Sequence, residues 1–423
     1  MMKKPELLAP AGNLAKLKIA LEYGADAVYA SVGSFSLRAR SGKEFDLDSF
    51  NEGVRYTHKK GAKFYATLNA FPFNGQIEPL KRHIKTMADM GVDAFIIASA
   101  GVMSLAKELA PNVEIHLSTQ ANVMNYLDAK IYMDMGACRI VAAREMSLKD
   151  AVLIKQKLPE LEIEIFCHGS MCFAYSGRCL ISAVQNGRSS NRGACANDCR
   201  FAYNLYAHNE NSDVLFRIEQ SEQGTHIFNS KDLNLSAHIE KIMQSGAVDS
   251  LKIEGRTKSE YYVACATRAY RMAIDDAAAG NFSPQLYADE LNTLKNRGFS
   301  DGYLISRPYE KTDSQNLRTN ISQGAAQVES YSEDGKSFLA KGQVYLNKDY
   351  EILAPLSSDL QPCKDEIGEI YERGGKYYMR FFKLLSTTGK EFSEIHSGNT
   401  NAILLPNGTP AFSFLRTRLD DIS

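Results

Sequence analysis

The feature that most constrains the fold is a unit that recurs between residues 21 and 256. In each copy a helical pattern ends at a glycine, one or two small or acidic residues follow, and a short apolar run begins. Glycine suits the end of a helix because it adopts a left-handed backbone conformation without strain. The copies lie at residues 21–32, 58–70, 87–99, 132–144 and 243–256.

The apolar runs in these units are typical of strands that are buried on both faces. Further strands are expected at 6–12, 113–120 and 161–169. About eight strands alternating with helices predict a (β/α)8 TIM-type barrel rather than an open doubly wound sheet. In a TIM barrel the carboxyl ends of the strands converge on one mouth, where function lies. The polar residues expected there are Asn69, Ser118, Thr119, Gln120, Asn122, Arg144, Glu145, His168, Lys252, Glu254 and Arg256.

The rest of the chain differs in pattern from the barrel. We expect the barrel domain to span 1–305, with a hairpin inserted at about 201–230. Residues 306–324 are polar and irregular, which predicts a linker. Short alternating strands follow, so residues 325–423 are predicted to form a small all-β barrel domain.

Composition narrows the class of protein. The 423 residues are 44% hydrophobic and 23% charged, as in globular proteins, and the net charge of −1 offers no argument for nucleic-acid binding. The N-terminus lacks the apolar core of a signal peptide, and no run of about 18 apolar residues predicts a membrane helix. We therefore expect a cytoplasmic protein whose cysteines are metal ligands or reactive thiols rather than disulfides.

Five of the eight cysteines lie between residues 167 and 200. Six residues separate Cys172 from Cys179, and three separate Cys195 from Cys199. Four thiolates bind either zinc or an iron–sulfur cluster. The wide, glycine-containing spacing favours an iron–sulfur cluster, with zinc as the alternative. Cys167, at a strand end, is interpreted as a small buried hydrophobic residue, and the cysteines outside the segment are interpreted as packing residues: Cys138, Cys265 and Cys363.

Arginines accompany the cysteines and the strand ends. Arg178 lies inside the cysteine segment, Arg38 follows the second strand, and Arg144 and Arg256 follow later strands. Two interpretations stay open, because arginine neutralises nearby thiolates and also binds carboxylates or phosphates in a bidentate manner.

The stretch "HGSMCFAYSGRCLIS" (168–182) closely resembles the signature of the U32 family, historically classed as collagenase-like peptidases. The stretches "LSTQANVMN", "VAAREMS", "NSKDLNL" and "LKIEGR" also match the pattern of that family. The resemblance covers the barrel and, more loosely, the β-domain. It implies two competing functions, namely peptide hydrolysis and an oxygen-independent hydroxylation that uses a four-iron cluster on four cysteines.

The chain most resembles the group of this family that hydroxylates the wobble uridine of tRNA to 5-hydroxyuridine in a prephenate-dependent process. Carried over by motif, the 4Fe-4S ligands would be Cys172, Cys179, Cys195 and Cys199. Relatives that act in ubiquinone hydroxylation have one ligand further on, where this chain has Asn234, and this supports Cys199 as the fourth ligand. Hydroxylation of an rRNA cytidine is a further alternative.

The residues favour hydroxylation over proteolysis. The chain has no H-E-x-x-H and no G-x-S-x-G sequence. A catalytic triad assembled from distant positions stays open, and the nearest candidate is His168 beside Cys167, although adjacent strand residues point to opposite faces. A redox cluster serves oxidation rather than hydrolysis. The alternatives are a peptidase and a noncatalytic factor that binds tRNA or protein.

The resemblance also suggests roles for the polar residues. Prephenate is a dicarboxylate, so its expected partners are Arg144, Arg178 and Arg256, then Arg38, with Gln120, Asn122 and Lys252 as further substrate-binding candidates. Proton transfer is assigned to Glu145, Glu254 or His168, although strand-end carboxylates also form salt bridges with arginines. His116 is expected either to face the barrel interior or to be a core histidine. The mixed basic and aromatic stretch 376–385 fits an RNA surface or a core strand.

Overall fold

The computed structural model describes residues 2–32, 35–36, 45–171, 181–186, 195–198, 205–208, 215–218, 231–296, 298–305 and 326–418.

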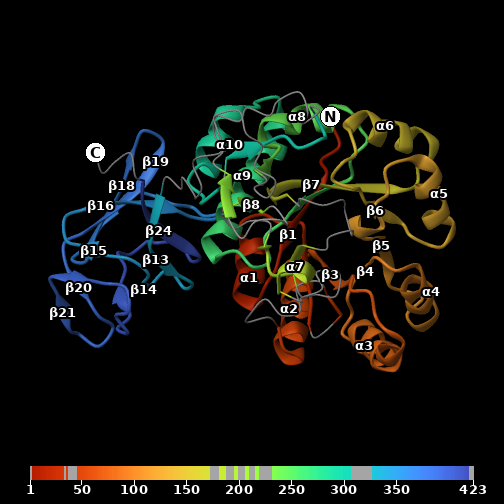
Figure 1. Cartoon of the computed structure of the whole chain (residues 1–423). Helices are drawn as coiled ribbons and strands as arrows, with labels where there is room; N and C mark the ends of the chain where they lie inside the picture. Colours follow the sequence, from red (N-terminus) through yellow and green to blue (C-terminus); the bar gives the residue numbers. More distant parts are fainter. Residues whose placement is uncertain are drawn as a thin grey trace.

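Eight parallel strands close into a barrel surrounded by helices (Figure 1), which confirms the predicted fold class. The first seven strands are neighbours in chain order, and β11 pairs with both β7 and β1 to close the ring. The barrel strands are β1 (Glu6–Pro10), β2 (Ala27–Ala30), β3 (Lys63–Leu68), β4 (Ala94–Ile97), β5 (Glu114–Leu117), β6 (Arg139–Val141), β7 (Glu162–Ser170) and β11 (Ser250–Ile253). The strand β10 (Asp232–Asn234) pairs antiparallel with β7, and β12 (Phe299–Ser300) pairs with β10.

Helices of the recurring unit end at glycines, as the sequence pattern predicts, and several helices are capped at their start. Side chains of Asn13, Asp46, Ser147 and others accept a hydrogen bond from the first turn. The glycines of the recurring unit have positive φ, from +64° to +108°, and they are Gly24, Gly61, Gly91, Gly136 and Gly246. Among the described helices, none is long and apolar enough to cross a membrane. The helices are α1 (Leu14–Glu22), α2 (Leu47–Lys59), α3 (Ile77–Asp89), α4 (Ala100–Leu109), α5 (Tyr126–Asp134), α6 (Leu148–Lys157), α7 (Ile181–Asn186), α8 (Ile239–Gln244), α9 (Glu260–Ala279) and α10 (Pro284–Leu291).

The barrel strands bury both faces. Outward residues such as Leu7 and Phe64 pack with the helices in the main core. Their neighbours Leu8 and Tyr65 point the other way and form a small cluster inside the barrel. Because side chains alternate along a strand, each strand needs apolar residues on both sides, which explains the nearly continuous apolar runs.

The C-terminal region consists of antiparallel sheets with their own apolar core, and Figure 1 shows these strands in blue beside the barrel. The largest sheet has eight strands in the order β17-β18-β19-β16-β24-β13-β14-β23. The strands are β13 (Ala326–Ser332), β14 (Ser337–Ala340), β15 (Val344–Tyr345), β16 (Asp349–Leu353), β17 (Cys363–Lys364), β18 (Gly368–Arg373), β19 (Lys376–Phe381), β20 (Leu384–Leu385), β21 (Glu391–Phe392), β22 (Glu394–Ile395), β23 (Ile403–Leu404) and β24 (Ser413–Arg418).

In the segment of the predicted hairpin, β8 (Leu205–His208) pairs antiparallel with β9 (Leu215–Ile218). The predicted linker, 306–324, lies outside the described residues, so the domain boundaries stay predictions.

Buried polar contacts join the C-terminal sheets to the barrel. Arg416 of β24 is 1% exposed and forms 2.6 Å ion pairs with Glu290 of α10 and Glu351 of β16. The Tyr23 hydroxyl, at the end of α1, donates to the carbonyl oxygens of Leu353 (2.9 Å) and Phe412 (2.8 Å). Because a buried ion pair is costly to break, these contacts hold the two parts together.

Candidate functional site at the barrel mouth

Arg256, just after β11, binds hydroxyl groups from neighbouring strand ends. Its guanidinium donates to Ser31 Oγ (2.5 Å), Thr67 Oγ1 (3.1 Å) and Ser36 Oγ (2.7 Å). Only 9% of Arg256 is exposed. The three hydroxyls orient the guanidinium.

Gly12, after β1, allows the backbone of Arg256 to reach this position. A Cβ atom on Gly12 would lie 2.0 Å from the Arg256 carbonyl oxygen, which is far inside van der Waals contact. Only glycine therefore fits between the ends of β1 and β11 at this point.

Arg144, after β6, is the second cation at the mouth. Its guanidinium carbon lies 3.9 Å from the centre of the Phe166 ring, and its Nη1 lies 3.4 Å from Met171 Sδ. Arg144 is half-buried, and within the part of the chain that the structure describes it has no carboxylate partner. Asp301 lines the same hollow, and its carboxylate lies 3.9 Å from His238 Nε2.

Gln120 and Asn122 follow β5 beside the Arg144 loop. The Val123 carbonyl accepts from Ala143 N (3.1 Å), and Thr119 Oγ1 donates to the Ala142 carbonyl (2.9 Å), which ties the two loops together. Gln120 Nε2 and Asn122 Oδ1 are buried without a hydrogen-bond partner among the described residues. Such groups are costly to leave unpaired, so they mark positions where a ligand would be bound favourably.

Lys252 lies inside the barrel, in an ion-paired network. Its ammonium contacts Glu164 at 2.7 Å and lies 4.5 Å from the centre of the Tyr29 ring. Burial lowers the pKa of Lys252. Burial opposes ionisation of Glu164, but the charges of Lys252 and Arg139 outweigh it, so the pKa of Glu164 is lowered.

Sequence reasoning missed the other members of this network. Arg139 lies 2.6 Å from Glu6, 2.7 Å from Glu162 and 3.3 Å from Glu164. The available signal was charge inside apolar strands: Glu164 alternates with isoleucines in "LEIEIF", and Lys252 interrupts "SLKI". Charges at inward positions of a barrel strand have to find partners across the interior.

His168 packs in an aromatic environment rather than at the mouth. Its ring lies 5.7 Å from Tyr262, 5.6 Å from Tyr270 and 5.6 Å from Phe299. Burial lowers its pKa to about 4, so the ring is neutral at neutral pH. Cys167 Sγ instead contacts the Lys252 carbonyl at 3.4 Å, and burial raises the pKa of its thiol.

The two candidate carboxylates lie at different places. Glu254 follows β11, where its backbone N–H donates to the His168 carbonyl (2.9 Å). Gly169 makes this approach possible, because its φ is +105° and a Cβ there would lie 2.5 Å from the Glu254 carbonyl. Glu145 lines a separate hollow with Lys149 and Lys241.

The cysteine segment is described only in part. Cys172, Cys179 and Cys199 lie outside the described residues, as do Arg38 and Arg178. Cys195 is half-buried, with Sγ 3.8 Å from Asn197 Oδ1. Asn234 accepts from the Tyr270 hydroxyl at 3.1 Å. Because Met171 contacts Arg144, the segment begins at the barrel mouth. The assignment of the four ligands stays a prediction, because three of these cysteines lie outside the described residues.

An aromatic pair lies on the C-terminal sheet. Tyr371 and Tyr378 stack with ring centres 5.9 Å apart, and Arg373 lies 4.3 Å over Tyr378. Met379 and Phe381 of the same stretch are fully buried core residues. The stretch 376–385 therefore combines a core strand with basic and aromatic side chains beside it.

The model of peptidase family U32 matches residues 12–314. The chain belongs to peptidase family U32. A relative from Helicobacter pylori (strain ATCC 700392 / 26695), "tRNA hydroxylation protein P", is 56% identical over 99% of this chain and 100% of its own length. The Escherichia coli (strain K12) protein of the same name is 37% identical over 84% of this chain and 87% of its own length. The E. coli "23S rRNA 5-hydroxycytidine C2501 synthase" is 37% identical over 64% of this chain and 39% of its own length.

Proposed function

We propose that this U32 chain is a tRNA-modifying enzyme that hydroxylates the wobble uridine to 5-hydroxyuridine, with prephenate as co-substrate and a 4Fe-4S cluster as redox group. Two relatives that match most of the chain are named as tRNA hydroxylation proteins. The structural observation that supports the proposal most is Arg144, a half-buried cation at the barrel mouth that has no carboxylate partner in the described part of the chain.

A dicarboxylate needs two cationic partners, and the mouth offers Arg144 and Arg256. The aromatic ring of Phe166 supports one face of the Arg144 guanidinium and leaves its N–H edge to bind a carboxylate. The hydroxyls of Ser31, Ser36 and Thr67 fix the orientation of Arg256. Lys252 contributes less to binding, because Glu164 already neutralises it.

The uncharged amide groups of Gln120 and Asn122 would form hydrogen bonds with the ligand. Gln120 Nε2 donates and Asn122 Oδ1 accepts, so the pair suits a ligand that carries both kinds of polar group. Either the ring substituents of a co-substrate or the edge of a pyrimidine base has this character. Binding would remove the cost of leaving both atoms unpaired.

Cys172, Cys179, Cys195 and Cys199 would hold the cluster. Four thiolates fit a cubane cluster, and the contact between Met171 and Arg144 brings the start of their segment to the mouth. When bound, such a cluster would supply electron transfer. Because Cys195 would be one of the four ligands, a Cys195→Ala protein should lose most of its iron.

The family name suggests a peptidase as a second candidate. That candidate needs an activated nucleophile, and Cys167 and His168 do not supply one, because the thiol contacts the Lys252 carbonyl and the imidazole packs against tyrosines. Hydroxylation of an rRNA cytidine is the other alternative, favoured by the similarity to the E. coli rRNA synthase.

The deciding experiment is mass spectrometry of nucleosides from tRNA and rRNA of a strain that lacks the gene. We expect tRNA 5-hydroxyuridine to disappear, to return with the wild-type gene, and to stay absent with Arg144→Ala. Arg55→Ala, on the exposed side of α2, is the matched control and should restore the modification. Unchanged tRNA with loss of rRNA 5-hydroxycytidine would replace this proposal by the rRNA alternative. Full activity of Arg144→Ala would show that Arg144 is not needed to bind the co-substrate.

A further inference from the structure

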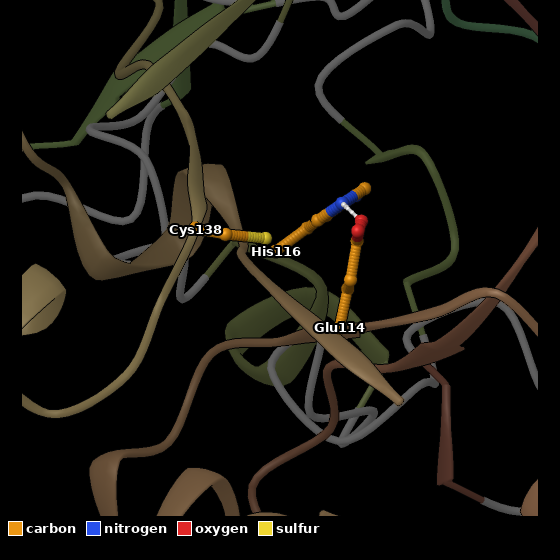
Figure 2. Close-up of side chains that lie close together, drawn as sticks. All are labelled: Glu114, His116 and Cys138. Carbon is orange, nitrogen blue, oxygen red and sulfur yellow. Dashed lines mark ion pairs between the residues drawn. The ribbon is translucent and has the colours of Figure 1, made fainter. Parts of the chain in front are cut away.

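Three potential metal ligands lie together at the end of the barrel opposite the mouth. Glu114 and His116 are the first and third residues of β5, and Cys138 directly precedes β6 (Figure 2). One ligand atom from each residue lies within 4.8 Å of the other two. Glu114 and His116 are two positions apart and share a face of the strand. The backbone bond from Cys138 N to the Ile115 carbonyl (3.1 Å) holds the third residue alongside.

The histidine is the observation that points to a ligand. The His116 ring is 0% exposed, and within the described part of the chain neither ring nitrogen has a hydrogen-bond partner. Glu114 Oε2 lies 3.5 Å from Nε2, but this contact lacks hydrogen-bond geometry. It is the ion pair that the dashed line marks in Figure 2. A buried imidazole whose nitrogens form no hydrogen bond is costly unless something else binds it.

We infer that Glu114, His116 and Cys138 form a zinc-binding site at the floor of the barrel. A mixed set of oxygen, nitrogen and sulfur donors suits zinc among the common metal ions. In tetrahedral zinc sites with ordinary bond lengths, neighbouring donor atoms lie about 3.3–3.6 Å apart. The Glu114–His116 distance of 3.5 Å already has this value.

Charge and access also fit a cation. The Glu114 side chain is 51% exposed, so an ion reaches the site from solvent. Around the site the carboxylates outnumber the basic groups by one, even with Arg139 present. The acidic groups are Glu6, Glu114, Glu162 and Glu164, and the basic groups are Lys63, Arg139 and Lys252. Zinc binds the thiolate form of cysteine, so ion binding would release the Cys138 thiol proton.

The position of the site indicates its role. The amino-terminal face of a TIM barrel serves stability rather than chemistry. A zinc ion here would link β5 to the start of β6. It would stabilise the barrel because it binds the folded chain and not the unfolded chain. This inference does not depend on the hydroxylation reaction.

The test uses the full chain, purified without oxygen, and Co²⁺ as a spectroscopic probe for zinc. Compared with the wild-type chain, Cys138→Ser should bind about one fewer cobalt ion per chain and lose part of the sulfur-to-cobalt charge-transfer absorption. Cys363→Ser, in the C-terminal sheet, is the control and should match the wild type. Any metal held by the cysteine segment is common to all three proteins and cancels in the comparison. Iron content should be the same in all three, which separates this site from the proposed cluster.

Added zinc should also raise the unfolding temperature of the wild-type and Cys363→Ser proteins more than that of Cys138→Ser. Glu114→Gln changes an exposed side chain and keeps the thiol, so it decides the question if Cys138→Ser folds poorly. We expect it to weaken cobalt binding at least about tenfold. Equal cobalt stoichiometry and affinity in the wild type and Glu114→Gln would overturn the inference.

Discussion

Arg139 and Arg144 lie at the two ends of the same strand and have opposite surroundings. Arg139, at the start of β6, contacts three carboxylates, from Glu6, Glu162 and Glu164. Arg144, just past the end of β6, contacts a ring and a thioether. The difference shows that the arginine at the barrel floor is neutralised by carboxylates of the fold, whereas the arginine at the mouth has no carboxylate partner in the described part of the chain.

The largest effect is expected from Arg139→Ala. The change leaves buried Glu164 and part-buried Glu6 without their shared cation, so the free energy of unfolding should fall by about 3–5 kcal/mol. Urea unfolding with added chelator measures the loss without a contribution from zinc. Arg55→Ala, which removes an exposed arginine, should change stability by less than about 0.5 kcal/mol. Equal values for the two variants would contradict a structural role for Arg139.

Glu164→Gln should lower the free energy of unfolding by about 3 kcal/mol at neutral pH, because Lys252 loses its buried partner. The pKa of Glu164 is lowered by folding from its ordinary value of 4.5. Its contribution is therefore complete above pH 4.5 and is lost as pH falls through the lower folded value. The stability gap between the wild type and Glu164→Gln should narrow below pH 4.5, in urea titrations at several pH values. A constant gap would show that Glu164 does not titrate as proposed.

Gly12→Ala should lower stability by about 1–3 kcal/mol, because the new Cβ collides with the Arg256 carbonyl. It should also abolish tRNA hydroxylation, since Arg256 moves away from the mouth. Gly75→Ala is the matched control, because no atom lies within 4 Å of a Cβ at Gly75. Normal hydroxylation by a Gly12→Ala protein would show that the position of Arg256 is not critical.

Arg144→Ala should have the smallest effect on folding and the largest on function. Its ring contact contributes only about 0.5–1 kcal/mol, so urea unfolding should change by no more than that. Hydroxylation of tRNA should nevertheless be lost, and Arg144→Lys should restore part of it, because lysine keeps the charge but not the bidentate geometry. A stability loss as large as that of Arg139→Ala would show that Arg144 also stabilises the fold.

The sequence predicted the barrel well because its signals are local. Helix ends at Gly61 or Gly91 and buried strands such as β3 and β4 depend on neighbouring residues, which the pattern contains. The strand-end set was less reliable as a description of the mouth. His168 was expected there, but the pairing of β7 with β11 shifts register between Lys252 and Ile253, and the His168 ring packs against α9.

By itself the sequence determined the order of strands and helices, the family, and which positions carry charge. Only the tertiary structure decided which charges have partners. Glu6, Arg139, Glu164 and Lys252 lie on four strands from different parts of the chain, and they meet because β11 closes the ring between β1 and β7. Ion pairing depends on which strands become neighbours, and that is a property of closure rather than of any local stretch.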